Sequence, residues 1–184
     1  MKKSLLAAVL SVPLAGSLAF AQDAPPAEGG EGAPMEEMGT DKKMSFGADC
    51  AVVLPIGTFG DGAGLGIGAL LKFGYSINEA IMATVRAGYI FHLEKLGAKF
   101  AQIPLTVGGK YMFGSAYGAA EIGLVSGKSD APGASRVNKM ALGLGGGYMV
   151  GDLDLRLSFN MIDLGHAGDT QEIMINIGYD FAHF

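Results

Sequence analysis

From Met44 onward, apolar side chains recur at every second position of the chain. A period of two places successive side chains on opposite faces of a β-strand, whereas a helix requires a period near 3.6. The alternation is clear in the segments 80–91, 100–113, 152–162 and 171–181, and weaker in 44–54, 64–75, 116–127 and 139–150. Each segment has about 10 to 14 residues, which is long for a soluble strand and typical of a tilted strand that crosses a membrane. The pattern therefore predicts eight membrane-spanning strands.

The connections between these segments are alternately short and long. Short ones lie near 76–79, 114–115 and 151–152, and longer ones near 55–63, 92–98, 128–138 and 164–170. Outer-membrane barrels are connected in this way, with tight turns at one rim and longer loops at the other. The expected fold is all-β, an eight-stranded antiparallel up-and-down transmembrane β-barrel formed by residues 44–184.

The bulk of the side chains indicates which face of the strands points outward. The interior of an eight-stranded barrel is just wide enough for its side chains, so a glycine-rich polar face fits inside, and a face of Leu, Ile and Phe would overpack it. Ten charged residues, five of each sign, lie on the polar face: Asp49, Lys72, Arg86, Lys110, Glu121, Lys139, Asp154, Arg156, Glu172 and Asp180. Because a Lys or Arg facing lipid at mid-bilayer costs about 2–4 kcal/mol, we expect these groups to form an ion-pair network that fills the lumen.

Aromatic residues gather where four strands reach the short-turn rim, and all lie on the apolar face. They are Phe73, Tyr75, Tyr111, Phe113, Tyr148, Tyr179 and Phe181. Aromatic rings at the headgroup level of the membrane form girdles around such barrels. The seven residues are therefore the expected aromatic girdle.

The segment Ile175–Phe181, which reads INIGYDF, resembles the closing strand of small eight-stranded outer-membrane barrels of the OmpX/Ail and OmpA type. In those families a terminal aromatic residue on the lipid face looks like the signal that the barrel-assembly machinery reads. The resemblance thus implies an outer-membrane location, that machinery and membrane lipid as partners, and an assembly signal among Tyr179, Phe181 and Phe184. Phe181 and Phe184 lie on opposite phases of the alternation, and a bulge at the end of the strand would reconcile them.

The first 43 residues are unlike the rest of the chain. Residues 1–21 combine a basic start, an uncharged apolar run and the sequence Ala19-Phe20-Ala21, which is typical of a cleaved signal peptide and of an exported protein. Residues 22–43 contain three Pro and four Gly, with six acidic residues against two basic ones. Such a segment buries too little apolar surface to fold, so we expect a disordered acidic linker in the periplasm.

Composition excludes several classes of partner and chemistry. The net charge of −5 argues against nucleic acid, and a single Cys excludes a disulfide framework and a Cys-built metal site. Two outer-loop histidines, His92 and His166, are too few for a metal site. Together with Ser126 and Asp169 they show no spacing of nucleophile, base and orienting group. We therefore expect a monomer with no metal, no cofactor and no enzymatic activity.

Three roles are compatible with a barrel of this kind. A balanced set of luminal charges favours a structural plug, because a selective pore more often carries an excess of one sign. A narrow polar channel is an alternative, since many luminal glycines leave room for water. A third is adhesin-like binding of a surface ligand through the outer loops, with Lys128, Asp130, Pro132 and Arg136 in the third long loop as candidate contacts. A structural or surface-interaction role is the leading hypothesis.

Overall fold

The computed structural model describes residues 43–95, 97–130 and 133–184. The expected signal peptide (1–21), nearly all of the expected linker (22–43) and Pro132 lie outside the described residues.

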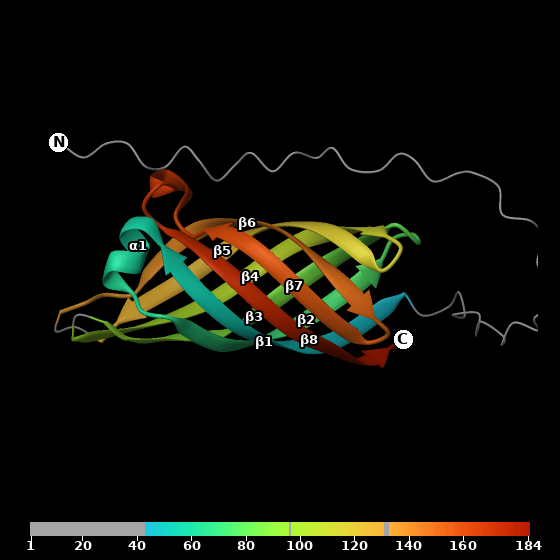
Figure 1. Cartoon of the computed structure of the whole chain (residues 1–184), viewed down its shortest axis with the longest axis horizontal. Coiled ribbons are helices and arrows are strands. Elements are labelled where there is room, and N and C mark those ends of the chain that lie inside the picture. Colours follow the sequence, from blue (N-terminus) through green and yellow to red (C-terminus); the bar gives the residue numbers. More distant parts are fainter. Residues whose placement is uncertain (1–42, 96, 131–132) are drawn as a thin grey trace, which may run out of the picture. The chain divides into compact units, whose positions relative to one another are not determined.

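Eight antiparallel strands close into one barrel, in which each strand pairs with its neighbours in sequence and β1 pairs with β8 (Figure 1). The strands are β1 (Met44–Ile56), β2 (Gly66–Ser76), β3 (Ile81–Lys95), β4 (Ala98–Phe113), β5 (Ala116–Ser129), β6 (Val137–Val150), β7 (Leu153–Met161) and β8 (Gln171–His183). The predicted eight-stranded up-and-down barrel is confirmed.

The two ends of the barrel differ in their connections (Figure 1). The end that carries the C-terminus, called the terminal end below, has the tight turns 77–80, 114–115 and 151–152. Gly114 and Gly151 take φ values of 72° and 59° in two of these turns, a region that residues with a side chain rarely adopt. The opposite end, called the loop end, carries the helix α1 (Gly57–Gly62), the 3-10 turn η1 (Leu164–His166), and residues 130 and 133–136 between β5 and β6. Among the described residues, no helix has the length and apolar character needed to cross a bilayer.

One of the predicted long loops is wrong. The sequence placed a loop at 92–98, but β3 continues to Lys95 and β4 begins at Ala98, and these two residues pair across the hairpin. Glu94 and Lys95 extend the strand although both are charged, because the outermost part of this hairpin is exposed and tolerates charge.

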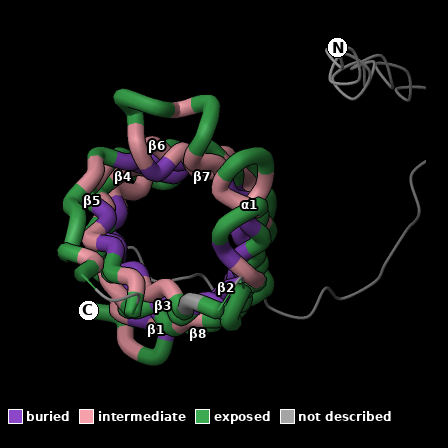
Figure 2. Tube along the Cα trace, turned by 90° about the vertical axis from the view of Figure 1, so that its left-hand side faces the viewer, coloured by how far each residue is buried: buried purple, intermediate pink, exposed green. Residues whose placement is uncertain are grey.

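Buried and exposed residues alternate along the strands, as the colours of the chain trace show (Figure 2). In β2, for example, Leu70 and Lys72 are buried inside, whereas Ile67, Leu71 and Tyr75 are exposed outside. The same alternation leaves Val, Leu, Ile and aromatic side chains exposed around the barrel. An apolar outer surface of this extent suits contact with lipid rather than water.

A bulge in β8 resolves the phase conflict at the end of the chain. The register between β1 and β8 shifts by one residue, with Gly47 opposite Asp180 and Phe46 opposite Ala182, so Phe181 has no partner on β1. Beyond the bulge the outward phase is reversed, and Phe184 pairs through its backbone with Met44 at 2.9 and 3.1 Å. Phe181 and Phe184 are consequently both exposed on the outer surface.

Candidate functional site: the filled lumen

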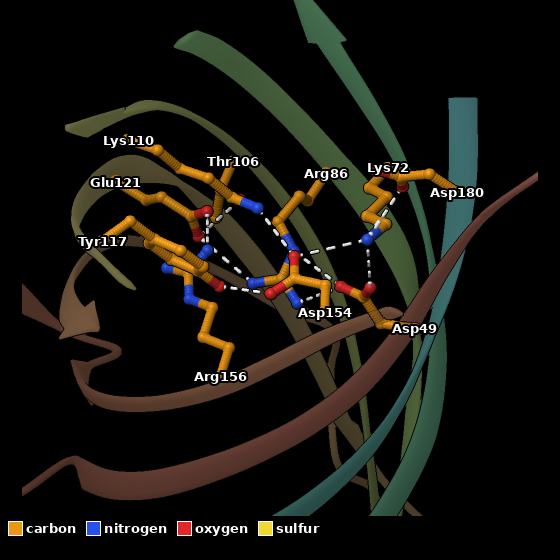
Figure 3. A network of polar contacts seen from close by, with 10 residues as sticks. All are labelled: Asp49, Lys72, Arg86, Thr106, Lys110, Tyr117, Glu121, Asp154, Arg156 and Asp180. Carbon is orange, nitrogen blue, oxygen red and sulfur yellow. Dashed lines mark hydrogen bonds and ion pairs between the residues drawn. The ribbon is translucent and has the colours of Figure 1, made fainter. Parts of the chain in front are cut away.

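Eight charged side chains meet inside the barrel toward the terminal end, and we call this group the charged layer (Figure 3). Its members are Asp49 of β1, Lys72 of β2, Arg86 of β3, Lys110 of β4, Glu121 of β5, Asp154 and Arg156 of β7, and Asp180 of β8. All eight are buried, and four are positive and four negative. Strands far apart in sequence therefore contribute a neutral set of charges to one level of the lumen.

Asp154 is the acceptor that links the two lysines. Lys110 Nζ lies 2.6 Å from its Oδ2, and Lys72 Nζ lies 3.3 Å from the same oxygen. Lys72 also reaches Asp180 Oδ1 at 2.8 Å and Asp49 Oδ1 at 3.5 Å. Each ammonium group thus finds at least one carboxylate within ion-pair distance, which offsets the cost of removing it from water.

Tyr117 belongs to this layer although the sequence analysis did not single it out. Its hydroxyl donates a hydrogen bond to Asp154 Oδ1 at 2.5 Å, and Lys110 Nζ lies 4.4 Å from its ring centre. Tyr117 shares the inward phase of β5 with Glu121, four residues away. That shared phase is the signal that could have revealed it.

The two arginines are joined through Glu121. Arg86 Nη1 lies 3.5 Å from Glu121 Oε2, and Arg156 Nη1 lies 2.5 Å from Glu121 Oε1. Arg86 also binds Asp49 Oδ2 through Nε at 3.1 Å and through Nη2 at 2.5 Å. The carboxylate of Glu121 therefore lies between two guanidinium groups and offsets the repulsion between them.

Glycines on neighbouring positions make the room that this layer needs. A methyl group at Gly47 would overlap the Asp180 carboxylate, and one at Gly178 would overlap the Asp49 carboxylate. Strand β6 contributes no charge to the layer. A methyl group at its Gly147 would collide with the ring of Tyr117.

Two of the ten predicted members lie outside the charged layer. Lys139 is half-exposed at the loop end, where its Nζ pairs with Asp163 Oδ2 at 2.6 Å. Glu172 is 2% exposed and has no cation within ion-pair distance among the described residues. Its oxygens accept hydrogen bonds from Asn160 Nδ2 at 3.2 Å and Gln102 Nε2 at 3.4 Å. The alternation correctly predicts that Lys139 and Glu172 face the lumen. Both residues lie closer to the loop end than the charged layer does.

Apolar side chains fill the lumen above the charged layer. One buried cluster consists of Ala51, Val53, Leu70, Ile90 and Met174, and a second of Val125, Ala141 and Ile162, against which Phe59 of α1 packs. These clusters occupy the part of the lumen toward the loop end. The lumen is thus ionic at one level, whereas at the other these apolar clusters lie beside the polar side chains of Gln102, Asn160 and Glu172.

His92 was expected in an outer loop and is instead inside the barrel. It is fully buried on β3, and its Nδ1 lies 2.9 Å from the carbonyl oxygen of Gly64. The rings of Phe59 and Phe100 lie 5.8 and 5.4 Å from its own, centre to centre. The expectation was wrong because the alternation of β3 continues past residue 91 and carries His92 inward.

Internal spaces in the lumen are small. One of about 10 Å³ lies within the charged layer, and one of about 30 Å³ lies between Arg86, Gln102 and Glu172. A buried water needs about 10–15 Å³, so the first space has room for one water and the second for about two. A wider recess of about 280 Å³ opens at the loop end, lined by Phe59, Phe100 and Ile162 among others.

The polar residues of the loop end make contacts among themselves. Asp163 accepts hydrogen bonds from Lys139 and, at 3.0 Å, from the N–H of Gly165, and these bonds hold the pKa of its carboxyl below the usual value. His166 Nδ1 lies 3.3 Å from Asp163 Oδ2, and Thr58 donates to Asp169 at 3.4 Å. Ser126, which was considered as a nucleophile, lies on the outward phase of β5, whereas His92 faces the lumen. Within the described ranges, no three His, Cys, Asp or Glu side chains are placed to hold a metal ion.

All seven residues of the expected aromatic girdle are exposed on the outer surface near the terminal end: Phe73, Tyr75, Tyr111, Phe113, Tyr148, Tyr179 and Phe181. The rings of Tyr111 and Phe113 lie 4.9 Å apart, and Phe181 makes an edge contact with Phe46 at 5.2 Å.

Comparison with solved structures gives the fold a context. Neisserial surface protein A superimposes with a TM-score of 0.58 at 18% identity, over 73% of this chain and 94% of that one. Ail, the attachment invasion locus protein of Yersinia pestis, superimposes with a TM-score of 0.50 at 17% identity, over 76% of this chain and 95% of that one. The chain has the fold of small eight-stranded outer-membrane β-barrels. No protein-family model matches the chain, and no curated protein does.

This similarity confirms the resemblance that was based on the last strand, and it confirms a transmembrane β-barrel as the fold class. Neisserial surface protein A and Ail share fewer than one residue in five with this chain, so they establish the architecture alone.

Proposed function

We propose that this protein is a monomeric structural barrel of an outer membrane, closed to solutes by the side chains in its lumen. The charged layer is the observation that carries the proposal. Its four cations and four anions neutralise one another, and the spaces found beside them measure about 10 Å³ and, next to Arg86 and Glu121, about 30 Å³. A hydrated ion needs a far wider path, and a selective pore would more often show an excess of one sign.

The orientation follows from the connections and the aromatic rings. The terminal end faces the periplasm in this proposal, because outer-membrane barrels carry their tight turns on that side. The exposed aromatic residues of that end then form the inner girdle at the headgroup level. Phe181 and Phe184 both point outward, so either can present the terminal aromatic group to the assembly machinery.

Enzymatic turnover and binding of large ligands have less support. Ser126 and His92 face opposite sides of the barrel wall, so they cannot act as nucleophile and base. One of the four loop-end connections is reduced to a tight hairpin between Lys95 and Ala98, which leaves less surface for an adhesin-like contact. Both observations favour the structural role.

Conductance of the purified full-length mature protein in planar bilayers tests the proposal. We expect no steady single-channel openings for the natural sequence. The matched variants are Lys110→Gln, inside the charged layer, and Lys43→Gln, an exposed lysine before β1. Steady openings in the natural protein that change with Lys110→Gln and persist unchanged with Lys43→Gln would identify a conducting lumen and overturn the proposal.

A further inference from the structure

A groove of about 590 Å³ runs along the outer surface of β3, β4 and β5 near the loop end. Its floor is apolar and includes Phe91, Ala101 and Ile103, which share the outward phase with the rest of the lipid-facing surface. Three cationic residues also line it: Lys99 and Lys128, at the loop-end ends of β4 and β5, and Arg136, directly before β6. The groove therefore joins an apolar wall to a cationic rim.

The pairing of the strands explains why the surface is hollow here. Ala101 lies opposite Phe91 on one side and opposite Lys128 on the other. The smallest of the three side chains is thus at the centre of the row, between an aromatic ring and a long cation. One step further from the rim, Ile103 lies opposite the small Ser126.

The three cations of the rim have no carboxylate partner among the described residues. The acidic residue of the groove, Asp130, accepts a hydrogen bond from the backbone N–H of Lys99 at 2.7 Å, not from any of the cationic groups. Other lysines of the loop end are engaged: Lys95 donates to the carbonyl oxygen of Gly60, and Lys139 pairs with Asp163. The cationic rim is positive overall and its charges are available.

We propose that this groove binds a phosphate-bearing lipid of the surrounding leaflet. The phosphate lies against Lys99, Lys128 and Arg136, and an acyl chain follows the floor formed by Phe91, Ala101 and Ile103. A lipid fits better than a soluble anion because the floor is part of the membrane-facing surface, where an acyl chain is always present. The proposal does not depend on whether the lumen conducts.

The energetic basis is the attraction between surface cations and an anionic headgroup. Each Lys or Arg near a membrane surface contributes about 1 kcal/mol to such binding. Loss of two of the three cations is expected to weaken the preference for an anionic lipid by about 30-fold.

The absence of Trp from the sequence allows a direct measurement. In full-length mature protein, Leu105→Trp places one indole on the outer surface of β4, next to the groove but not in its lining. The protein is reconstituted in phosphatidylcholine bilayers that contain brominated phosphatidic acid or, in parallel, brominated phosphatidylcholine. Preferential quenching by the brominated phosphatidic acid reports binding at the groove.

Matched variants separate the groove from general attraction to anionic membranes. Lys99→Gln/Lys128→Gln removes two charges from the rim, and Lys43→Gln/Lys95→Gln removes two lysine charges elsewhere. A second reporter, Ile175→Trp, lies on the outer surface of β8, a strand that does not line the groove. Heat-modifiable gel mobility verifies that each variant is folded before it is measured.

We expect phosphatidic acid to be preferred at the Leu105→Trp reporter, and this preference to fall with the rim variant but not with the control variant. Equal preference at both reporters, or a preference that survives in the rim variant, overturns the proposal. Rim-dependent binding of inorganic phosphate without any preference for brominated phosphatidic acid would point to a soluble anion and would also overturn it.

Discussion

The charged layer and the loop-end part of the lumen are filled in different ways. In the charged layer, each buried carboxylate faces at least one cation, and the contacts run from strand to strand across the lumen. Toward the loop end, apolar clusters predominate and the buried carboxyl of Glu172 has only amide donors from Asn160 and Gln102.

The two levels show that the presence of polar groups in a lumen does not by itself tell whether their charges are compensated. Buried charges are tolerated where each one is neutralised, and removal of one partner leaves another charge buried and uncompensated. A carboxyl group with amide donors alone lacks that compensation. The same type of substitution should therefore act differently at the two levels.

Removal of a cation from the charged layer should have the largest effect. Arg86→Met takes away the guanidinium that binds Asp49 and approaches Glu121. Because two carboxylates lose a partner in a buried site, we expect the free energy of unfolding to fall by about 3–5 kcal/mol. Urea titration of the refolded barrel in lipid bilayers measures this change.

Lys139→Met is the control for that experiment. It also removes one ion-paired cation, but Lys139 is half-exposed and its partner Asp163 lies in a loop-end segment that keeps other donors. We expect a much smaller loss of stability. If Arg86→Met and Lys139→Met lower the free energy of unfolding equally, the buried ion pairs of the charged layer stabilise the barrel no more than an exposed ion pair does.

A neutral substitution of Glu172 should have a smaller effect of the opposite sign. Glu172→Gln retains the shape of the side chain and removes a carboxyl group that has no cationic partner among the described residues. We expect unfolding at neutral pH to become harder by up to about 1 kcal/mol, since a buried carboxylate without a cation costs more to desolvate than an amide of the same shape.

The matched change in the charged layer is Glu121→Gln, which weakens the contacts to Arg86 and Arg156 and should destabilise the barrel. The same urea titration compares the two variants. If Glu172→Gln and Glu121→Gln lower the free energy of unfolding by similar amounts, the carboxyl group of Glu172 is stabilised as well as that of Glu121. The two levels of the lumen would then not differ in this respect.

The strands, their faces and the closure of the barrel could be predicted from the sequence because alternation is a local property of the chain. Each residue of the charged layer was assigned to the correct face for this reason. The height of a side chain along the barrel depends on the register between strands, which alternation does not encode. Lys139 and Glu172 were consequently grouped with residues that lie at another level.

The ends of the strands were the least predictable part. Glu94 and Lys95 are typical of a loop, yet β3 extends through them, because a strand that leaves the lipid no longer needs an apolar outer face. The bulge at Phe181 was foreseen as a way to reconcile two aromatic residues on opposite phases. Its position became visible only in the pairing of β8 with β1.

The smallest expected effect concerns the loop end itself. The hydrogen bond from Lys139 and the N–H of Gly165 lower the pKa of Asp163, with a further contact from His166. A carboxyl group whose pKa is lower in the folded state stabilises that state above its unfolded pKa, and this contribution is lost as the pH falls through the folded pKa. Acid should therefore loosen the contact between β6 and the segment before η1.

Carbon-detected NMR of the Asp163 carboxyl in bilayer nanodiscs measures this pKa directly. In Lys139→Met the strongest donor is absent, so we expect the pKa of Asp163 to rise toward the usual value for an aspartate. Arg136→Met, which removes another cation of the loop end that has no ion pair with Asp163, should leave this pKa unchanged. If both variants shift the pKa of Asp163 equally, this pKa depends on the overall charge of the loop end and not on the specific contact with Lys139.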